Sequence, residues 1–110
     1  MKPARFVGTA RADLAGFPKA ARLRAGHERF LVQAGREPSD WRPMPSIGPG
    51  VCEIRIRVSA GAFGVFYVAS LGEAVSVLHA CRKSTARTAR RDVALAAQRY
   101  REAWADLLAR

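Results

Sequence analysis

The segment from Val51 to Val58 constrains the fold most, because its apolar side chains recur at every second position between charged ones. This period of two is typical of a β-strand with one buried and one solvent-facing side. The residues expected in the core are Cys52, Ile54, Ile56 and Val58, and those expected to face outward are Glu53, Arg55 and Arg57. Two arginines are therefore predicted to lie two residues apart on one exposed surface.

Two further runs with strand character follow, at residues 63–70 and 74–81. The connections between the three runs are short enough for antiparallel hairpins. After Ser84 the apolar spacing changes to steps of three and four, which is typical of a helix. The stripe expected to pack across the sheet comprises Val93, Ala97, Tyr100, Trp104 and Leu107 or Leu108.

The N-terminal third predicts a short strand at residues 5–8, a helix capped by Thr9 that ends near Ala15, and a second helix from Lys19 to Gly35. The apolar stripe of that second helix is expected to comprise Ala20, Leu23, His27, Phe30 or Leu31, and Ala34. Residues 35–50 contain four prolines, which favours an ordered loop or a partner-binding segment that carries Trp41. The chain is thus predicted to form one α+β domain over residues 1–110, with a small antiparallel sheet flanked by an N-terminal helical hairpin and a C-terminal helix.

The chain is strongly basic, with 19 Lys and Arg residues against nine Asp and Glu and a net charge of +10. Such a charge predicts salt-sensitive binding to nucleic acid, to an anionic membrane or to an acidic protein. A compositional bias of the source toward arginine would explain the charge without any partner. A membrane partner is disfavoured and the cytoplasm is expected, because the sequence lacks a long apolar run and an apolar leader.

Four basic side chains are expected to form one electropositive concavity: Arg55, Arg57, Arg82 and Lys83. Such a site would clamp a phosphodiester and stabilise the charge that develops when a ribose 2′-hydroxyl attacks it. The residues are equally compatible with a solvated charged face.

The two histidines and two cysteines offer little further chemistry. His79 precedes the basic pair and could accept a proton, but strand alternation groups it with Val75 and Val77, which favours core packing. His27 is expected to pack within its helix. His79 and Cys81 could share a strand face, yet no further ligands stand at familiar spacing, so neither a metal nor a cofactor is expected.

Several short segments together resemble a known family: Asp13–Pro18, Glu37–Pro45, Gly48–Val51, Glu53–Arg57, Gly61–Phe63 and Val77–His79. Their order and spacing resemble the phage-derived, HigB-like branch of the RelE/ParE toxin superfamily, from about Lys2 to Tyr100. The resemblance implies a RelE-like fold and a toxin of a type II toxin-antitoxin system that cuts mRNA on the ribosome without a metal. It also implies a cognate antitoxin, expected to be a helix-turn-helix protein, that covers the basic surface. A gyrase-directed toxin is the other outcome known in this superfamily.

The resemblance also suggests roles for individual residues. The catalytic set would comprise Arg57, Arg82 and Lys83, with Tyr67 or His79 as the proton-transfer group. The residues expected to bind RNA are Arg55, Arg57, Arg82, Lys83, Thr85 and Arg87.

Two departures from the family pattern concern this set. Gly64 stands where relatives usually have an arginine, and Ser84 replaces a lysine. Since losing one charge-stabilising donor can cost about 10² to 10³ in rate, a weakened enzyme is expected. The alternative is a catalytically silent module that keeps the fold in order to bind an antitoxin or RNA.

Overall fold

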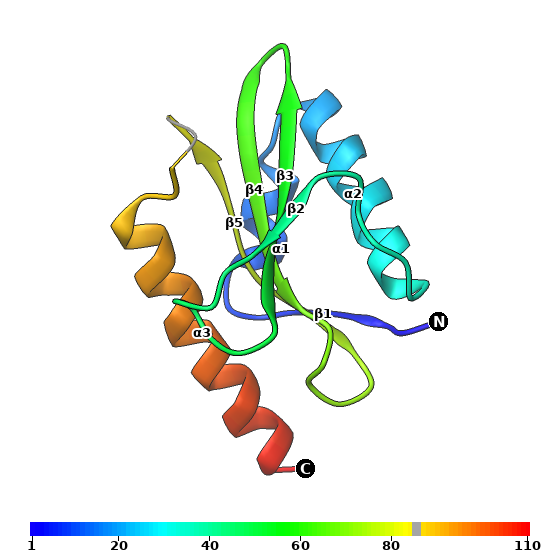
Figure 1. Ribbon diagram of the computed structural model, residues 1–110, viewed down its shortest axis with the longest axis vertical. Coiled ribbons are helices and arrows are strands. Elements are labelled where there is room, and N and C mark those ends of the chain that lie inside the picture. Colours follow the sequence, from blue (N-terminus) through cyan, green and yellow to red (C-terminus); the bar gives the residue numbers. More distant parts are fainter. Residues whose placement is uncertain (85–86) are drawn as a thin grey trace.

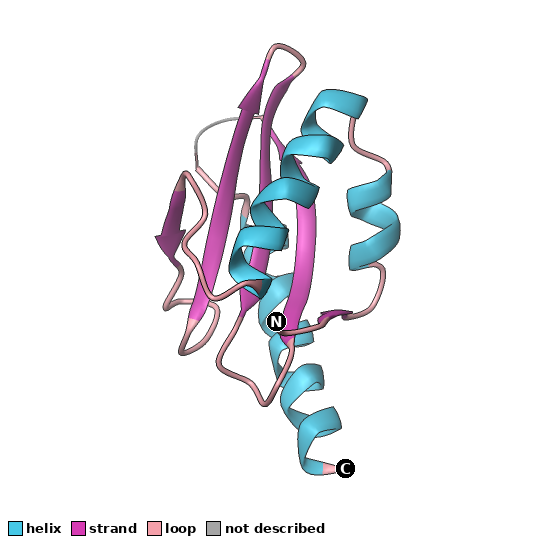
Figure 2. Cartoon of the chain, turned by 90° about the vertical axis from the view of Figure 1, so that its right-hand side faces the viewer, coloured by secondary structure: helices cyan, strands magenta, loops and turns pink. Residues whose placement is uncertain are grey.

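The computed structural model describes residues 1–84 and 87–110, which form a five-stranded sheet with helices on both faces (Figures 1 and 2). The strands are β1 (Ala4–Phe6), β2 (Trp41–Pro43), β3 (Val51–Val58), β4 (Gly61–Val68) and β5 (Val75–Lys83). The helices are α1 (Ala10–Ala15), α2 (Lys19–Gln33) and α3 (Arg90–Leu108). The predicted α+β class, with helices at both ends of the chain, is confirmed.

The strand order is β1-β5-β4-β3-β2, and β3, β4 and β5 form the antiparallel hairpins that the sequence predicts. The sheet is not wholly antiparallel, because β1 pairs with β5 in parallel. β2 is the opposite edge strand and contains Pro43, which an edge position tolerates because its outer side needs no donor.

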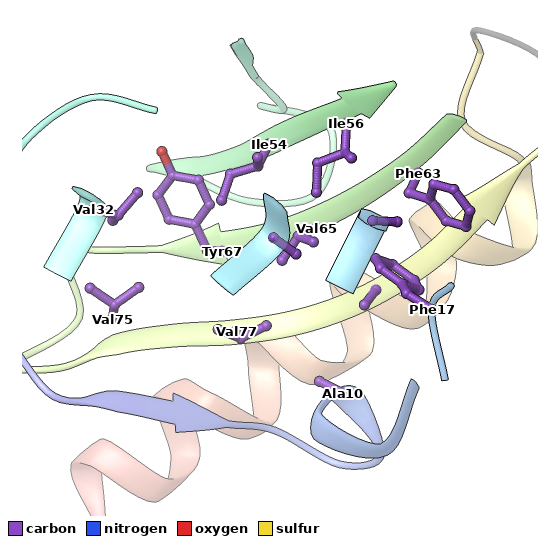
Figure 3. Close-up of a cluster of buried hydrophobic side chains, with 13 residues drawn as sticks. Ala10, Phe17, Val32, Ile54, Ile56, Phe63, Val65, Tyr67, Val75 and Val77 are labelled. Atoms are coloured by element: carbon purple, nitrogen blue, oxygen red, sulfur yellow. The ribbon is translucent and has the colours of Figure 1, made fainter. Parts of the chain in front are cut away.

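Helices α1 and α2 cover one face of the sheet, and an apolar cluster lies between them and the strands. In this cluster Phe17, between the two helices, contacts Phe63 of β4 with ring centroids 4.8 Å apart (Figure 3). The predicted apolar stripe of α2, which included His27, is wrong. The helix buries Ala21, Ala25, Glu28 and Val32. Leu23 and Phe30 remain 62% and 51% exposed. Small alanines allow close approach to the sheet, and Glu28 is accepted because the Ser39 amide and Arg24 bind its carboxylate at 2.8 and 3.3 Å.

The opposite face packs against α3 and the loop after β2. Met44 and Ile47 of that loop are buried in the same cluster as Tyr100, whose hydroxyl donates to the Pro49 carbonyl at 3.0 Å. The predicted loop is therefore ordered and held against the sheet, although Trp41–Pro43 within it form the edge strand β2. The predicted α3 stripe is partly right: Tyr100 is buried, whereas Trp104 remains 40% exposed. No helix within the described residues is long and apolar enough to cross a membrane.

Candidate functional site

Strand register decides which basic side chains share a face of the sheet. Arg57 of β3 lies opposite Ala62 of β4, which in turn lies opposite Lys83 of β5. Since side chains at paired positions point to the same side, Arg57 and Lys83 share one face, and Arg55 joins them two residues along its strand. We call this α3-facing side of the sheet, around Arg55, Arg57 and Lys83, the basic face.

Arg82 and Tyr67 lie on the other side. The Arg82 guanidinium sits 5.4 Å from the centroid of the Phe63 ring and donates to the Ala60 carbonyl. Tyr67 is buried between Val32 and the strands (Figure 3). Burial raises the pKa of its hydroxyl well above the ordinary value, so the phenol is not prepared to act as a base. The structure therefore does not gather all four predicted cations into one concavity.

Glu53 was expected to face solvent, but it is fully buried beneath the basic face. Its two carboxylate oxygens accept from Arg42 Nε at 2.7 Å and Lys83 Nζ at 2.9 Å. Gly64 makes room for this arrangement, since a Cβ there would lie 2.5 Å from Glu53 Oε2. The Lys83 side chain is only 5% exposed, so its ammonium is committed to an internal carboxylate.

The two arginines of β3 are the accessible cations of the basic face. Arg55 donates to Asp40 Oδ1 from Nε and a terminal nitrogen at 3.0 and 2.9 Å, in a pair that is about half exposed. Such exposed pairs contribute little and exchange readily. Arg57 is exposed, and within residues 1–84 and 87–110 no hydrogen-bonding or ion-pairing partner holds it. Arg57 is therefore the cation of the basic face that no internal acceptor holds within the described residues.

The start of α3 adds a second basic feature beside the end of β5. A cavity of about 200 Å³, which we call the α3 cavity, is lined by Arg82, Lys83, Ser84, Arg87, Thr88, Ala89, Arg90, Arg91 and Asp92. Arg87 was predicted to bind RNA, whereas Thr85 lies outside the described residues. Arg90 and Arg91 were missed, although two cations where a helix N-terminus prefers acids are an unusual sequence feature. This end of the molecule therefore attracts anions both through side chains and through the helix dipole.

His79 faces α3, so the prediction that grouped it with Val75 and Val77 is wrong. The register between β4 and β5 shifts at Phe66 and Tyr67, and this bulge reverses the alternation beyond it. The ring is 5% exposed and has Asp92 Oδ1 at 2.8 Å from Nε2 and an Arg99 nitrogen at 3.3 Å from Nδ1. Because a guanidinium can only donate, Nδ1 accepts and Nε2 carries the hydrogen toward Asp92. Both ring nitrogens are thus used inside the fold.

A family model of phage-derived Gp49-like proteins (DUF891) matches residues 12–101, which contain the basic face and the residues that line the α3 cavity. The chain belongs to this Gp49-like family. The Gp49-like family is phage-derived and lies within the RelE/HigB-like toxins. No curated protein matches the chain.

In this Gp49-like chain, three potential metal ligands converge between β5 and α3. One ligand atom each from His79, Cys81 and Asp92 lies within 4.8 Å of the others. Asp92 was missed because it comes from a different element, so spacing along β5 does not reveal it. Arg99 directs the Nε2 hydrogen into this group, and burial, with Asp92 beside it, raises the pKa of the Cys81 thiol to about 12. The group is therefore a hydrogen-bonded cluster whose nitrogen and sulfur both carry protons.

Arg99 is the residue of the Gp49-like fold that sequence reasoning missed most completely. It is 6% exposed and donates to the Leu78 carbonyl at 3.1 Å and the Thr9 hydroxyl at 2.7 Å, as well as to His79. Gly8 lies so close that a Cβ there would be 2.7 Å from Arg99 Nε. Arg99 joins α1, β5 and α3 and thereby fixes the base of the candidate site.

Proposed function

We propose that this Gp49-like protein is a toxin of a type II toxin-antitoxin system, in the HigB-like branch, that acts as a metal-independent, ribosome-associated mRNA endoribonuclease. A cognate helix-turn-helix antitoxin would neutralise it. Family membership supports the toxin assignment. The observation that carries the nuclease proposal is that exposed Arg57 lies in register, across β4, with Lys83 at the end of β5, and Lys83 also lines the arginine-rich cavity at the start of α3.

The RNA backbone would cross the basic face, with one phosphate held by Arg57 and a neighbouring phosphate by the arginines of the α3 cavity. Guanidinium groups suit this task because they remain charged and donate two parallel hydrogen bonds to phosphate oxygens. The RNA's own 2′-hydroxyl would attack the adjacent phosphorus and lose its proton to water, while the bond to the 5′-oxygen breaks and that oxygen takes a proton from water, leaving a 2′,3′-cyclic phosphate. Arg57 would stabilise the charge on the pentacoordinate phosphorus. The internal use of Lys83 and His79, together with Gly64, supports a rate below that of relatives.

Induction of the chain under tight control, followed by sequencing of cellular RNA ends, tests this proposal. We expect growth arrest and cuts in phase with codons. Arg57→Gln should reduce the cuts at least about tenfold, in keeping with the loss of one charge-stabilising group. Arg101→Gln is the matched control, because it removes the same charge from an exposed position further along α3. Absence of arrest and of phased cuts with the unaltered chain would contradict the nuclease proposal.

The second candidate is a catalytically silent module that binds RNA or an antitoxin. The observation that favours it is the commitment of both Lys83 and His79 to buried partners. Gly64→Arg separates the two candidates, because an arginine at this position would compete for Glu53 and release Lys83 toward the basic face. Since any Cβ there would lie 2.5 Å from Glu53 Oε2, the variant is compared only once a thermal melt shows a folded chain, and Gly64→Ala, which adds the same Cβ without a charge, is the matched control. Increased RNA cutting by this variant would indicate a weakened enzyme, whereas ribosome binding without cutting in both forms would indicate the silent module.

A further inference from the structure

The outer side of α2 carries an apolar surface that no described part of the chain covers. Leu23 and Phe30 are 62% and 51% exposed and stand seven residues apart, which places them on the same side of the helix two turns apart. Gly26 lies between them, and a Cβ there would meet nothing within 4 Å. His27 completes this surface. We call Leu23, Gly26, His27 and Phe30 the outer α2 stripe.

The exposed charges of α2 itself are all of one sign. The basic residues of the helix are Lys19, Arg22, Arg24 and Arg29. The single acid of α2, Glu28, is 2% exposed and faces the sheet, where it binds Arg24 and the Ser39 amide. These bonds lower its pKa although burial alone would raise it, so this carboxylate stays ionised inside. The solvent side of α2 therefore presents an apolar centre within a positive border.

We propose that the outer α2 stripe docks an acidic amphipathic α-helix of another protein. Apolar side chains two turns apart, with a notch at Gly26 between them, match the packing of one helix along another, where knobs from the partner fill gaps between side chains. Acidic residues beside the apolar seam of the partner would meet Lys19 and Arg22.

Charge complementarity selects this occupant over two others. A second copy of the chain would bring the same cations against this border, and each copy carries a net charge of +10. An RNA strand would satisfy the cations and stack a base on Phe30, but it would leave the aliphatic Leu23 in contact with water. An acidic amphipathic helix satisfies both features.

Docking on α2 would leave the basic face open, because α2 and α3 cover opposite faces of the sheet (Figure 2). A partner on the outer α2 stripe therefore does not compete with RNA for Arg55 or Arg57. The inference is independent of the proposed nuclease activity.

Fluorescence anisotropy with the whole chain and a labelled designed peptide tests this proposal. The probe is an alanine-based helix of about three heptads with leucine at the seam positions and glutamate beside them. A second probe replaces each glutamate with lysine. We expect saturable binding of the acidic probe and none of the basic probe.

Leu23→Gln and Phe30→Gln should each weaken binding of the acidic probe about tenfold or more, as expected for an apolar anchor at the centre of a contact. Both side chains are largely exposed, so thermal melts should stay unchanged. Leu108→Gln is the matched control, since this apolar side chain is 77% exposed on α3 and should not affect binding.

Three results would overturn the proposal. The first is no saturable binding of the acidic probe up to about 100 μM, well above the Kd of a specific helix–groove contact. The second is binding that Leu23→Gln and Phe30→Gln leave unchanged. The third is a wild-type dimer, seen by light scattering, that these substitutions abolish, because it would identify a second copy as the occupant.

Discussion

Replacing the buried carboxylate beneath the basic face tests the structural reasoning most directly. Glu53→Gln preserves the volume of the side chain but removes its charge. Lys83, with a side chain 5% exposed, would then face an amide at the position where Oε2 now accepts at 2.9 Å. The remaining carbonyl oxygen would still accept from Arg42 Nε at the position where Oε1 now accepts at 2.7 Å, but without a negative charge. The main cost is therefore an uncompensated buried ammonium.

Breaking a buried ion pair by removing one partner costs about 3–5 kcal/mol. With an unfolding entropy of about 2.1 cal/mol/K per residue, this cost corresponds for 110 residues to a fall in Tm of about 13–22 °C. Urea unfolding and calorimetry measure the two quantities independently. Glu73→Gln is the matched control, because that acid is exposed and should change stability by less than about 0.5 kcal/mol.

The double variant Glu53→Gln/Lys83→Met distinguishes an orphaned charge from a general loss of packing. Methionine matches the lysine stem without its ammonium, so the double variant should recover at least about 1.5 kcal/mol relative to Glu53→Gln alone. A single-variant cost below about 1 kcal/mol, or no recovery in the double variant, would refute the reasoning: Lys83 would then be reaching solvent and available to RNA.

Three further predictions concern packing and titration. Gly64→Ala should destabilise the fold by about 1–3 kcal/mol in urea titrations, because its Cβ would lie 2.5 Å from Glu53 Oε2. Gly26→Ala, at an open position of α2, should instead stabilise the fold by about 0.5–1 kcal/mol. Equal effects of the two substitutions on stability would contradict both assignments. Although burial opposes it, hydrogen bonding lowers the pKa of Glu28 in the fold, so its contribution is present above the unfolded pKa and lost as pH falls through the folded value; Glu28→Gln should accordingly lose less stability between pH 7 and pH 3 than the unaltered chain. Cys81, with a pKa raised to about 12, should react with iodoacetamide at pH 8 far more slowly in the folded chain than in urea, and rapid labelling without unfolding would contradict its burial beside Asp92.

The sheet could be predicted from the sequence because alternation in β3 and short turns specify hairpins locally. The face of His79 could not, since a bulge at Phe66 and Tyr67 changes the alternation and leaves no mark in spacing. Burial of Glu53 depends on Arg42, eleven residues away on β2, and on Lys83, thirty residues away on β5. Such long-range pairing reverses the usual expectation that charged residues face water.

The candidate site could also be predicted only in part from the sequence. Adjacent residues of a strand point to opposite sides of the sheet, so Arg82 and Lys83 cannot share a face. The alternation along β5 was therefore sufficient to show that the predicted concavity could not contain both side chains. Arg90 and Arg91 enter the site only because the start of α3 lies beside the end of β5. Their contribution depends on how the helix is placed, which local patterns do not determine.

The parallel pairing of β1 with β5 and the bond from Arg99 to Thr9, which spans 90 residues, together determine when folding can finish. β1 has no pairing partner until β5 has been synthesised, and the Thr9 hydroxyl does not accept its hydrogen bond from Arg99 until α3 has been synthesised. During translation, a nascent chain that ends before α3 therefore lacks the bonds that assemble its α3-facing surface. Nascent chains released before Arg99 has been synthesised should therefore fail to assemble the α3-facing surface of the sheet.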